Sequence, residues 1–185
     1  MQGASSTGTL EEGPWEALPE ELVLRVLDEL EWTPRDSGAV RGSCRRWRAI
    51  HDAGRKTLRV RNGVTDEVMH ALRGRLPALT FLDLRWVKSL TVEGLRAVGG
   101  LTALATLNLY NCPNVTDVGL RELRGLTSLT QLYLVHCRSV TDVGLQELTS
   151  LTALTYLNLY GCSTSKLGRD ALKAAIPGLT ISGRR

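Results

Sequence analysis

The sequence predicts an α/β solenoid, in which repeated units stack so that their strands form a parallel sheet, preceded by a small all-α segment. One pattern recurs almost without gaps, in units of equal length that span residues 76–100, 101–125 and 126–150 and in a fourth that begins at Leu151. A different pattern, with helical spacing, occupies residues 15–56. A fixed period indicates one supersecondary unit stacked on itself. Such a stack favours a binding surface over a buried catalytic site.

A short strand is predicted in each unit from the strict alternation of leucine with other residues. One such stretch spans residues 106–110, and the equivalent stretches are 81–85, 131–135 and 156–160. Alternation at a period of two is typical of a half-buried strand, so the leucines point inward and the residues between them point out. Residues 58–61 supply an earlier, degenerate strand, and residues 176–181 resemble the start of another. We therefore expect five or six parallel strands.

A helix on the opposite side of each unit is predicted from capping and spacing. Residues 116–117 and 141–142 are Thr-Asp pairs, which offer an N-cap and a first-turn acid, whereas residues 91–92 are Thr-Val. Leucine and valine follow at helical spacing. Glycine recurs in register inside these helices, at Gly94, Gly119 and Gly144. Because glycine in a helix costs about 1 kcal/mol relative to alanine, its recurrence indicates close packing between neighbouring units.

Three of the four cysteines follow the repeat. Cys112, Cys137 and Cys162 occupy the same position in successive units, which indicates a stacked row rather than a disulfide framework. Buried cysteine behaves as a small apolar group, and a reducing compartment fits this usage. A zinc ion needs four converging ligands, which a row does not supply, so we expect no metal site and no cofactor. The sequence contains no recognisable catalytic motif, and we expect no catalytic residues.

The formal net charge of +4 is unevenly distributed. Residues 57–185 carry 15 bases and nine acids, a surplus that either favours an acidic partner or belongs to an ordinary solvated surface. Residues 1–14 lack the features of a secretory signal, and we expect a disordered segment there. No apolar run approaches the roughly 18 residues that span a membrane. We expect a soluble protein of the cytoplasm or nucleus that binds neither membrane nor nucleic acid and is a monomer outside any complex.

The repeat pattern resembles leucine-rich repeats of the cysteine-containing type. Units of that family carry the leucines of a strand, then a cysteine, and then Thr-Asp-x-Gly-Leu. Residues 104–120 and 129–145 match every fixed position, while the first unit lacks the cysteine and the aspartate and the last loses the Thr-Asp-x-Gly end. The resemblance covers residues 57 to 181. It implies a short right-handed α/β horseshoe of about five repeats, within residues 57–185, with its parallel strands on the concave face.

Outward-pointing strand residues form the predicted binding face, with arginine at its early end and tyrosine at its late end. Tyrosine and arginine dominate binding hot spots. Alternatively, the tyrosines stack to cover the leucines, and Arg59 pairs with Asp83 on the neighbouring strand. Five strands span only about 20–25 Å, which suits a peptide or a small domain. The candidate substrate-binding residues are Arg59, Arg61, Phe81, Asp83, Arg85, Asn108, Tyr110, Tyr133, Tyr156, Asn158 and Tyr160.

Residues 15–56 resemble an F-box. The similarity is carried by a Leu-Pro pair at residues 18–19, an apolar helix at residues 22–30 and the run Cys-Arg-Arg-Trp at residues 44–47. Ser37 and Ser43 depart from the family, which usually has apolar residues there. In that family the F-box docks on a Skp-type adaptor that links to a cullin. The resemblance assigns the adaptor contact or its supporting core to Leu18, Pro19, Leu22, Val26, Leu27, Leu30, Cys44 and Trp47. The alternative is a helical cap that shields the first repeat.

An F-box followed directly by leucine-rich repeats is the layout of a known class of substrate receptors. The resemblance therefore implies a non-catalytic subunit of an SCF-type cullin ubiquitin ligase, whose repeats capture the protein to be ubiquitinated. The alternative is a scaffold or competitive inhibitor that binds a partner through its repeats and has no ubiquitin role. A small-molecule sensor is a third reading, although the sensors of this family use a far longer horseshoe that closes around the ligand.

Overall fold

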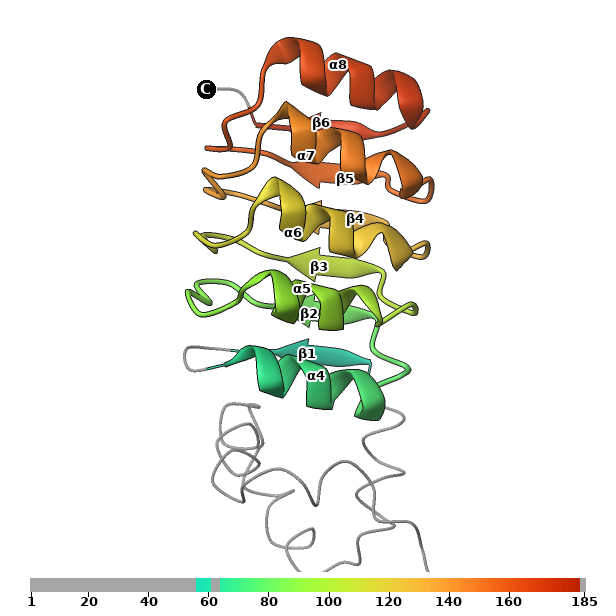
Figure 1. Ribbon diagram of the computed structural model, residues 1–185. Coiled ribbons are helices and arrows are strands. Elements are labelled where there is room, and N and C mark those ends of the chain that lie inside the picture. The colour runs from blue at the N-terminus through green and yellow to red at the C-terminus, as the bar shows by residue number, and fades with distance from the viewer. Residues whose placement is uncertain (1–55, 61–63, 184–185) are drawn as a thin grey trace, which may run out of the picture.

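The described part of the chain is a stack of α/β coils. The computed structural model describes residues 56–60 and 64–183. Figure 1 shows the strands stacked one above another, with the helices stacked in parallel on one side of the sheet. Within these residues the sheet has six parallel strands in chain order. They are β1 (Thr57–Arg59), β2 (Phe81–Asp83), β3 (Thr106–Asn108), β4 (Gln131–Tyr133), β5 (Tyr156–Asn158) and β6 (Thr180–Ser182).

Strand register follows the predicted repeat. Leu82 pairs with Leu107, and the ladder continues at the same spacing through Leu132 and Leu157. The first pair, Leu58 with Leu82, and the last pair, Leu157 with Ile181, are each one residue closer in the sequence than the central pairs. The four central leucines are fully buried. The prediction of five or six parallel strands whose leucines point into one core is therefore confirmed for the described residues.

Helices and short 3₁₀ segments close each coil on the side away from the sheet. Their buried leucines join the strand leucines in one continuous core. Two valines that share the predicted helical spacing, Val118 and Val143, are instead exposed, because they occupy the outer side of the first helical turn. The elements are α4 (Asp66–Arg75), α5 (Val92–Gly99), α6 (Asp117–Arg121), η1 (Glu122–Gly125), α7 (Asp142–Glu147), η2 (Leu148–Ser150) and α8 (Lys166–Ala175).

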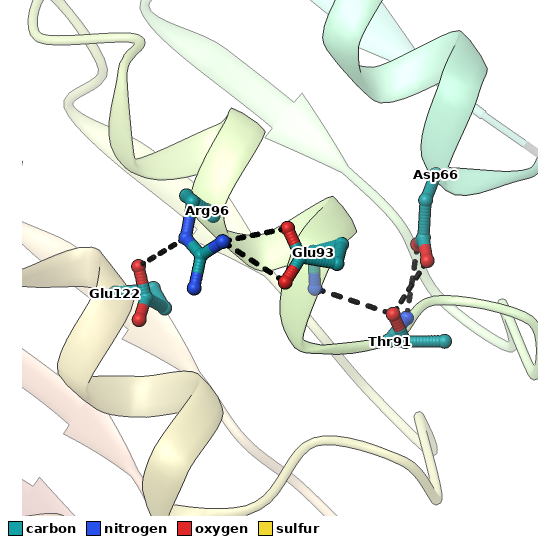
Figure 2. Close-up of polar contacts among 5 residues, drawn as sticks. All are labelled: Asp66, Thr91, Glu93, Arg96 and Glu122. Atoms are coloured by element: carbon teal, nitrogen blue, oxygen red, sulfur yellow. Dashed lines mark hydrogen bonds and ion pairs between the residues drawn. The ribbon is translucent and has the colours of Figure 1, made fainter.

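Aspartate at the start of one helix caps the helix of the next coil. Each aspartate accepts both the backbone N–H and the hydroxyl of the following N-cap residue, and Figure 2 shows one such contact. In the last contact the two distances are 2.8 and 2.6 Å, and the hydrogen bonds from Ser165 lower the pKa of Asp142. The aspartates thus join coils, a role additional to the predicted first-turn acid. The pairs are Asp66 with Thr91, Asp117 with Thr141, and Asp142 with Ser165.

A charged network replaces this contact between α5 and α6. Val92 stands where the other coils have aspartate and cannot accept a hydrogen bond from Thr116. Arg96 instead donates to Glu122 in the next coil at 3.0 Å and pairs with Glu93 in its own helix at 2.7 Å (Figure 2). The two coils are therefore joined through half-exposed ionic groups rather than through a capping carboxylate.

The recurrent helix glycines allow this close approach. A Cβ atom on Gly144 would overlap Asp117 Oδ1, and one on Gly119 would overlap Leu95. Gly94 and Gly168 stand in the same relation to the aspartate of the preceding coil. The predicted close packing between neighbouring units is confirmed. At Gly94, Gly144 and Gly168 a side chain would displace the carboxylate that caps the glycine's own helix, and at Gly119 it would displace Leu95.

The cysteines form the predicted row. Each thiol donates a hydrogen bond to a strand-end carbonyl of the preceding coil, at 3.0 to 3.1 Å. Burial raises the pKa of Cys112 to about 11 and the pKa of Cys137 and Cys162 to about 12. The raised pKa keeps these thiols protonated, so each one can donate its S–H to a backbone carbonyl. The cysteines are therefore packing groups that also serve as hydrogen-bond donors.

In the described part of the chain, no helix combines the length and the apolar character that a passage through a bilayer requires.

Replacement of Gly144 by alanine should destabilise the repeats. The added methyl group displaces the Asp117 carboxylate from its two hydrogen bonds with Thr141, and this loss exceeds the gain in helix propensity. We expect the free energy of unfolding in urea to fall by about 1–2 kcal/mol. The matched control is Gln146→Ala on the exposed side of α7, which should change it by less than about 0.5 kcal/mol. Equal effects of both substitutions would contradict the packing argument.

The three cysteines of the row should resist alkylation in the folded protein. Thiolate is the reactive form, and both burial and the raised pKa suppress it. We expect iodoacetamide at roughly pH 8 to leave Cys112, Cys137 and Cys162 unmodified, as mapped by peptide mass spectrometry, and to modify all three in concentrated urea. Glutathione in the same reaction serves as the reactive control. Rapid native-state modification of Cys137 would show that the row opens in solution.

Candidate binding surface

The residues between the strand leucines line the face of the sheet opposite the helices. Parallel register places equivalent outward-pointing residues side by side in two rows, which make up the predicted binding face. A third row continues just beyond the strand ends. The first row holds Thr57, Phe81, Thr106, Gln131 and Tyr156, the second holds Arg59, Asp83, Asn108, Tyr133 and Asn158, and the third holds Arg85, Tyr110, Val135 and Tyr160.

Three residues of the second row terminate their strands. The side-chain oxygen of Asp83, Asn108 or Asn158 accepts the backbone N–H two residues further on, at 3.0 to 3.2 Å. Short Asx side chains favour this local turn. Each of these candidate substrate-binding residues therefore has a structural role in the turn after its strand. Tyr133 occupies the equivalent position in β4, and its hydroxyl donates to Gln131 Oε1 at 3.1 Å.

Asp83 is buried, with 4% of its surface exposed, so the expectation that it points into solvent is wrong. The reason is its ion pair with Arg85: Oδ1 accepts from Nε and Oδ2 from a terminal guanidinium nitrogen, both at 3.0 Å. The alternative pairing with Arg59 is also wrong, because Arg85 occupies both carboxylate oxygens, and Arg59 itself is exposed on β1. Half of the Arg85 side chain remains exposed.

Two tyrosines pack together on the sheet face. The rings of Tyr133 and Tyr156 have centroids 5.4 Å apart and are tilted by 50°. Asn158 Nδ2 donates to the Tyr156 hydroxyl at 3.4 Å. Both tyrosines are half-buried. The alternative that the tyrosines stack over the leucines thus describes this pair, which leaves a rigid aromatic surface open on one side.

A continuous aromatic row crosses four coils at the carboxyl ends of the strands. We call Trp86, Tyr110, His136 and Tyr160 the aromatic row. Ring centroids are separated by 5.1 Å from Trp86 to Tyr110, 5.7 Å from Tyr110 to His136, and 5.3 Å from His136 to Tyr160. The last two contacts are edge-to-face, with interplanar angles of 88° and 79°. Sequence reasoning proposed the two tyrosines but missed the tryptophan and the histidine that connect them.

The missed residues share an unusual backbone conformation. Trp86 has φ of 67° and His136 has φ of 61°, and the equivalent residues Asn111 and Gly161 have φ of 52° and 75°. Every one of these four coils therefore needs a left-handed residue one position after the third row. Glycine and asparagine adopt this conformation readily and histidine is enriched in it, whereas a bulky side chain such as that of tryptophan costs about 1–2 kcal/mol there. This turn could have been predicted from the sequence, because asparagine and glycine stand at the same repeat position in two of the coils.

The remaining candidates lie outside the described residues. Arg61 is one of them. The eight candidates for the adaptor contact also lie outside the described residues: Leu18, Pro19, Leu22, Val26, Leu27, Leu30, Cys44 and Trp47.

Among solved structures, the chain is similar to internalins of Listeria monocytogenes. An internalin (inlF) matches 70% of this chain at 21% identity with a TM-score of 0.53, and this chain spans about a third of it, 35%. An internalin C2 matches 71% of this chain at 21% identity, with 58% of its own length covered and a TM-score of 0.41. No family model matches the chain, and no curated protein matches it. Internalins are leucine-rich-repeat proteins, and the described coils have the leucine-rich-repeat fold.

Replacement of Arg85 by alanine should destabilise the early coils because it leaves the buried Asp83 carboxylate without its counter-charge. We expect a loss of about 1–3 kcal/mol in the free energy of unfolding, measured in urea. The double variant Asp83→Asn/Arg85→Ala should recover most of this loss. Asparagine keeps the hydrogen bond to the backbone N–H, as Asn108 and Asn158 do in their own coils. No recovery in the double variant would contradict the charge argument.

Proposed function

We propose that this chain is a non-catalytic protein-binding subunit and that it serves as the substrate receptor of an SCF-type cullin ubiquitin ligase. One observation carries the proposal: an open sheet face rich in tyrosine and arginine directly follows the segment at residues 15–56 that resembles an F-box. Solenoids expose an extended surface rather than an enclosed pocket, and such surfaces bind macromolecules. The leucine-rich-repeat fold supports the binding part of the proposal.

The proposed division of labour follows the two parts of the chain. The F-box-like segment binds a Skp-type adaptor and through it a cullin. The sheet face binds an unidentified protein substrate, with exposed Arg59 and half-buried Phe81 at its early end and the Tyr133–Tyr156 pair at its late end. A receptor of this kind accelerates ubiquitin transfer by positioning: it raises the effective concentration of a substrate lysine near the conjugating enzyme.

Several features of the described coils agree with a role without chemistry of its own. The cysteine thiols are buried and their pKa is raised, which removes them as nucleophiles. His136 lies between two tyrosine rings, and His70 is exposed on α4. As part of the same proposal, the protein works without a cofactor, in the cytoplasm or nucleus, and is a monomer outside its complex.

A second candidate function is a scaffold or competitive inhibitor that binds a partner through the same sheet and has no ubiquitin role. The aromatic and basic character of the sheet serves this function equally well. Adaptor binding distinguishes the two, because only the receptor needs residues 15–56 to dock on a Skp-type protein.

The receptor role predicts tight binding of the purified full chain to a Skp-type adaptor from the same source. The triple variant Leu18→Ala/Leu27→Ala/Leu30→Ala removes three of the leucine side chains that are proposed to make the adaptor contact or its supporting core. Burial of one leucine side chain contributes about 1.5–3 kcal/mol to binding. We therefore expect the dissociation constant, measured by calorimetry, to rise at least roughly a hundredfold.

The control variant is Arg59→Glu, which changes the sheet face and should leave adaptor binding intact. It is a cleaner probe of substrate capture than a change of Arg85, because loss of Arg85 also leaves the Asp83 carboxylate unpaired. Circular dichroism of each variant checks that the repeats remain folded. Failure of the wild-type chain to bind the adaptor would leave the scaffold or inhibitor as the better account.

A further inference from the structure

The aromatic row offers an exposed apolar surface at the carboxyl ends of β2 to β5. Trp86 and Tyr160, its two end members, are 50% and 52% exposed, while Tyr110 and His136 between them are half-buried. The rings hold one another through edge and tilted contacts, so the surface is rigid before any ligand arrives. Contiguous exposed aromatic groups of this kind mark interaction sites, because Trp and Tyr are the commonest binding anchors.

Two members of the row occupy the left-handed turn position. The left-handed position is filled by Asn111 and Gly161 in two coils and by Trp86 and His136 in the other two. Histidine is among the residue types enriched in this conformation, whereas tryptophan rarely adopts it, and outliers such as Trp86 concentrate at functional sites. Trp86 and His136 are the two residues that turn isolated tyrosines into a continuous row.

The strand-end segments that carry the aromatic row hold an excess of basic residues. The four strand-end segments, residues 84–91, 109–116, 134–141 and 159–165, contain three bases and no acid. Arg85 is balanced by Asp83, but Lys88 and Arg138 are exposed and form no ion pair with any other residue that the structure describes. The aspartates that contact the ends of these segments, Asp66, Asp117 and Asp142, are engaged by the N-cap residues of the following helices. A ligand that lies along the row therefore meets Lys88 and Arg138 as the unpaired charges of these segments.

From these features we infer that the aromatic row is the docking site of an extended acidic peptide segment that carries apolar side chains on one face. The three centroid steps amount to roughly 16 Å. An extended chain rises about 3.3 Å per residue, so its same-face side chains recur about every 6.6 Å and three of them fit along the row. The inference rests on the proposed protein-binding function and gives the chemical class of the substrate segment.

Single-stranded nucleic acid is the competing acidic ligand, and the ring geometry disfavours it. Successive bases bind by stacking on open aromatic faces. In this row the edge of one ring meets the face of the next at 88° and 79°, so the rings present no series of parallel platforms. Apolar side chains of a peptide, in contrast, fit against edges and faces alike.

The test is a selection of random decapeptides, displayed on phage, against the immobilised full chain. Two variants accompany the wild type. Trp86→Asn/His136→Asn removes both connecting rings while supplying the residue that Asn111 shows the turn accepts, and Lys88→Glu/Arg138→Glu reverses the charge. Circular dichroism and urea unfolding establish that each variant is folded before use. Synthetic versions of the selected peptides and a ten-nucleotide oligouridylate are then titrated against all three proteins.

We expect the wild type to enrich peptides with net negative charge and at least two apolar side chains at alternate positions. Their dissociation constants should rise at least tenfold in each variant and should also rise with salt. Enrichment of neutral or basic peptides, equal binding to the ring-depleted variant, no enrichment at all, or tighter binding of the oligouridylate would each overturn the inference. Adaptor binding has no part in this selection, so a failure here leaves the receptor test unaffected, and the converse also holds.

Discussion

The constraint on which this structure depends is the parallel register that places each strand leucine beside its equivalent in the next coil. A single coil cannot bury its own leucines, because its strand and its helix together enclose too little volume. Stacking removes each leucine from water, at about 1.5–3 kcal/mol per side chain, and the sheet hydrogen bonds hold the register. The cysteine row, the capping aspartates and the aligned rings of the surface all inherit their positions from this one spacing.

Much of the fold could be predicted from the sequence because each repeat carries the same signals for a strand and for a helix start. Alternating leucines specify strands, and threonine followed by aspartate specifies helix starts. The repeat pattern does not predict which residue each polar side chain binds in the neighbouring coil. Asp117 looked like a first-turn acid, but it caps the helix of the next coil, and that contact exists only after stacking. Val118 fits the helical spacing of a core residue, yet it is exposed, since spacing alone does not fix where the apolar stripe ends.

Prediction of the surface was less complete for a related reason. Alternation correctly placed the rows of the sheet face, but it treated every outward position as available for binding. Asp83, Asn108 and Asn158 instead complete the turns that end their strands. Trp86 and His136 lie one residue beyond the alternating stretch, where a left-handed turn redirects the side chain, so the rule for strands no longer applied to them. The direction of a side chain after such a turn can be determined only from the backbone dihedral angles of the structure.

The substitution of Val92 for aspartate has a consequence for cooperativity. In a one-dimensional array, the coupling between neighbouring units decides whether the array melts as a whole or in segments. Between α5 and α6 the ionic coupling runs through the half-exposed pair Arg96–Glu122, without the capping carboxylate found at the other helical junctions of the described coils. Dissolved salt screens exposed charge pairs but leaves apolar contacts in place. Added salt therefore weakens the polar link at this junction, while the packing of Leu95 against Gly119 between the same two coils persists.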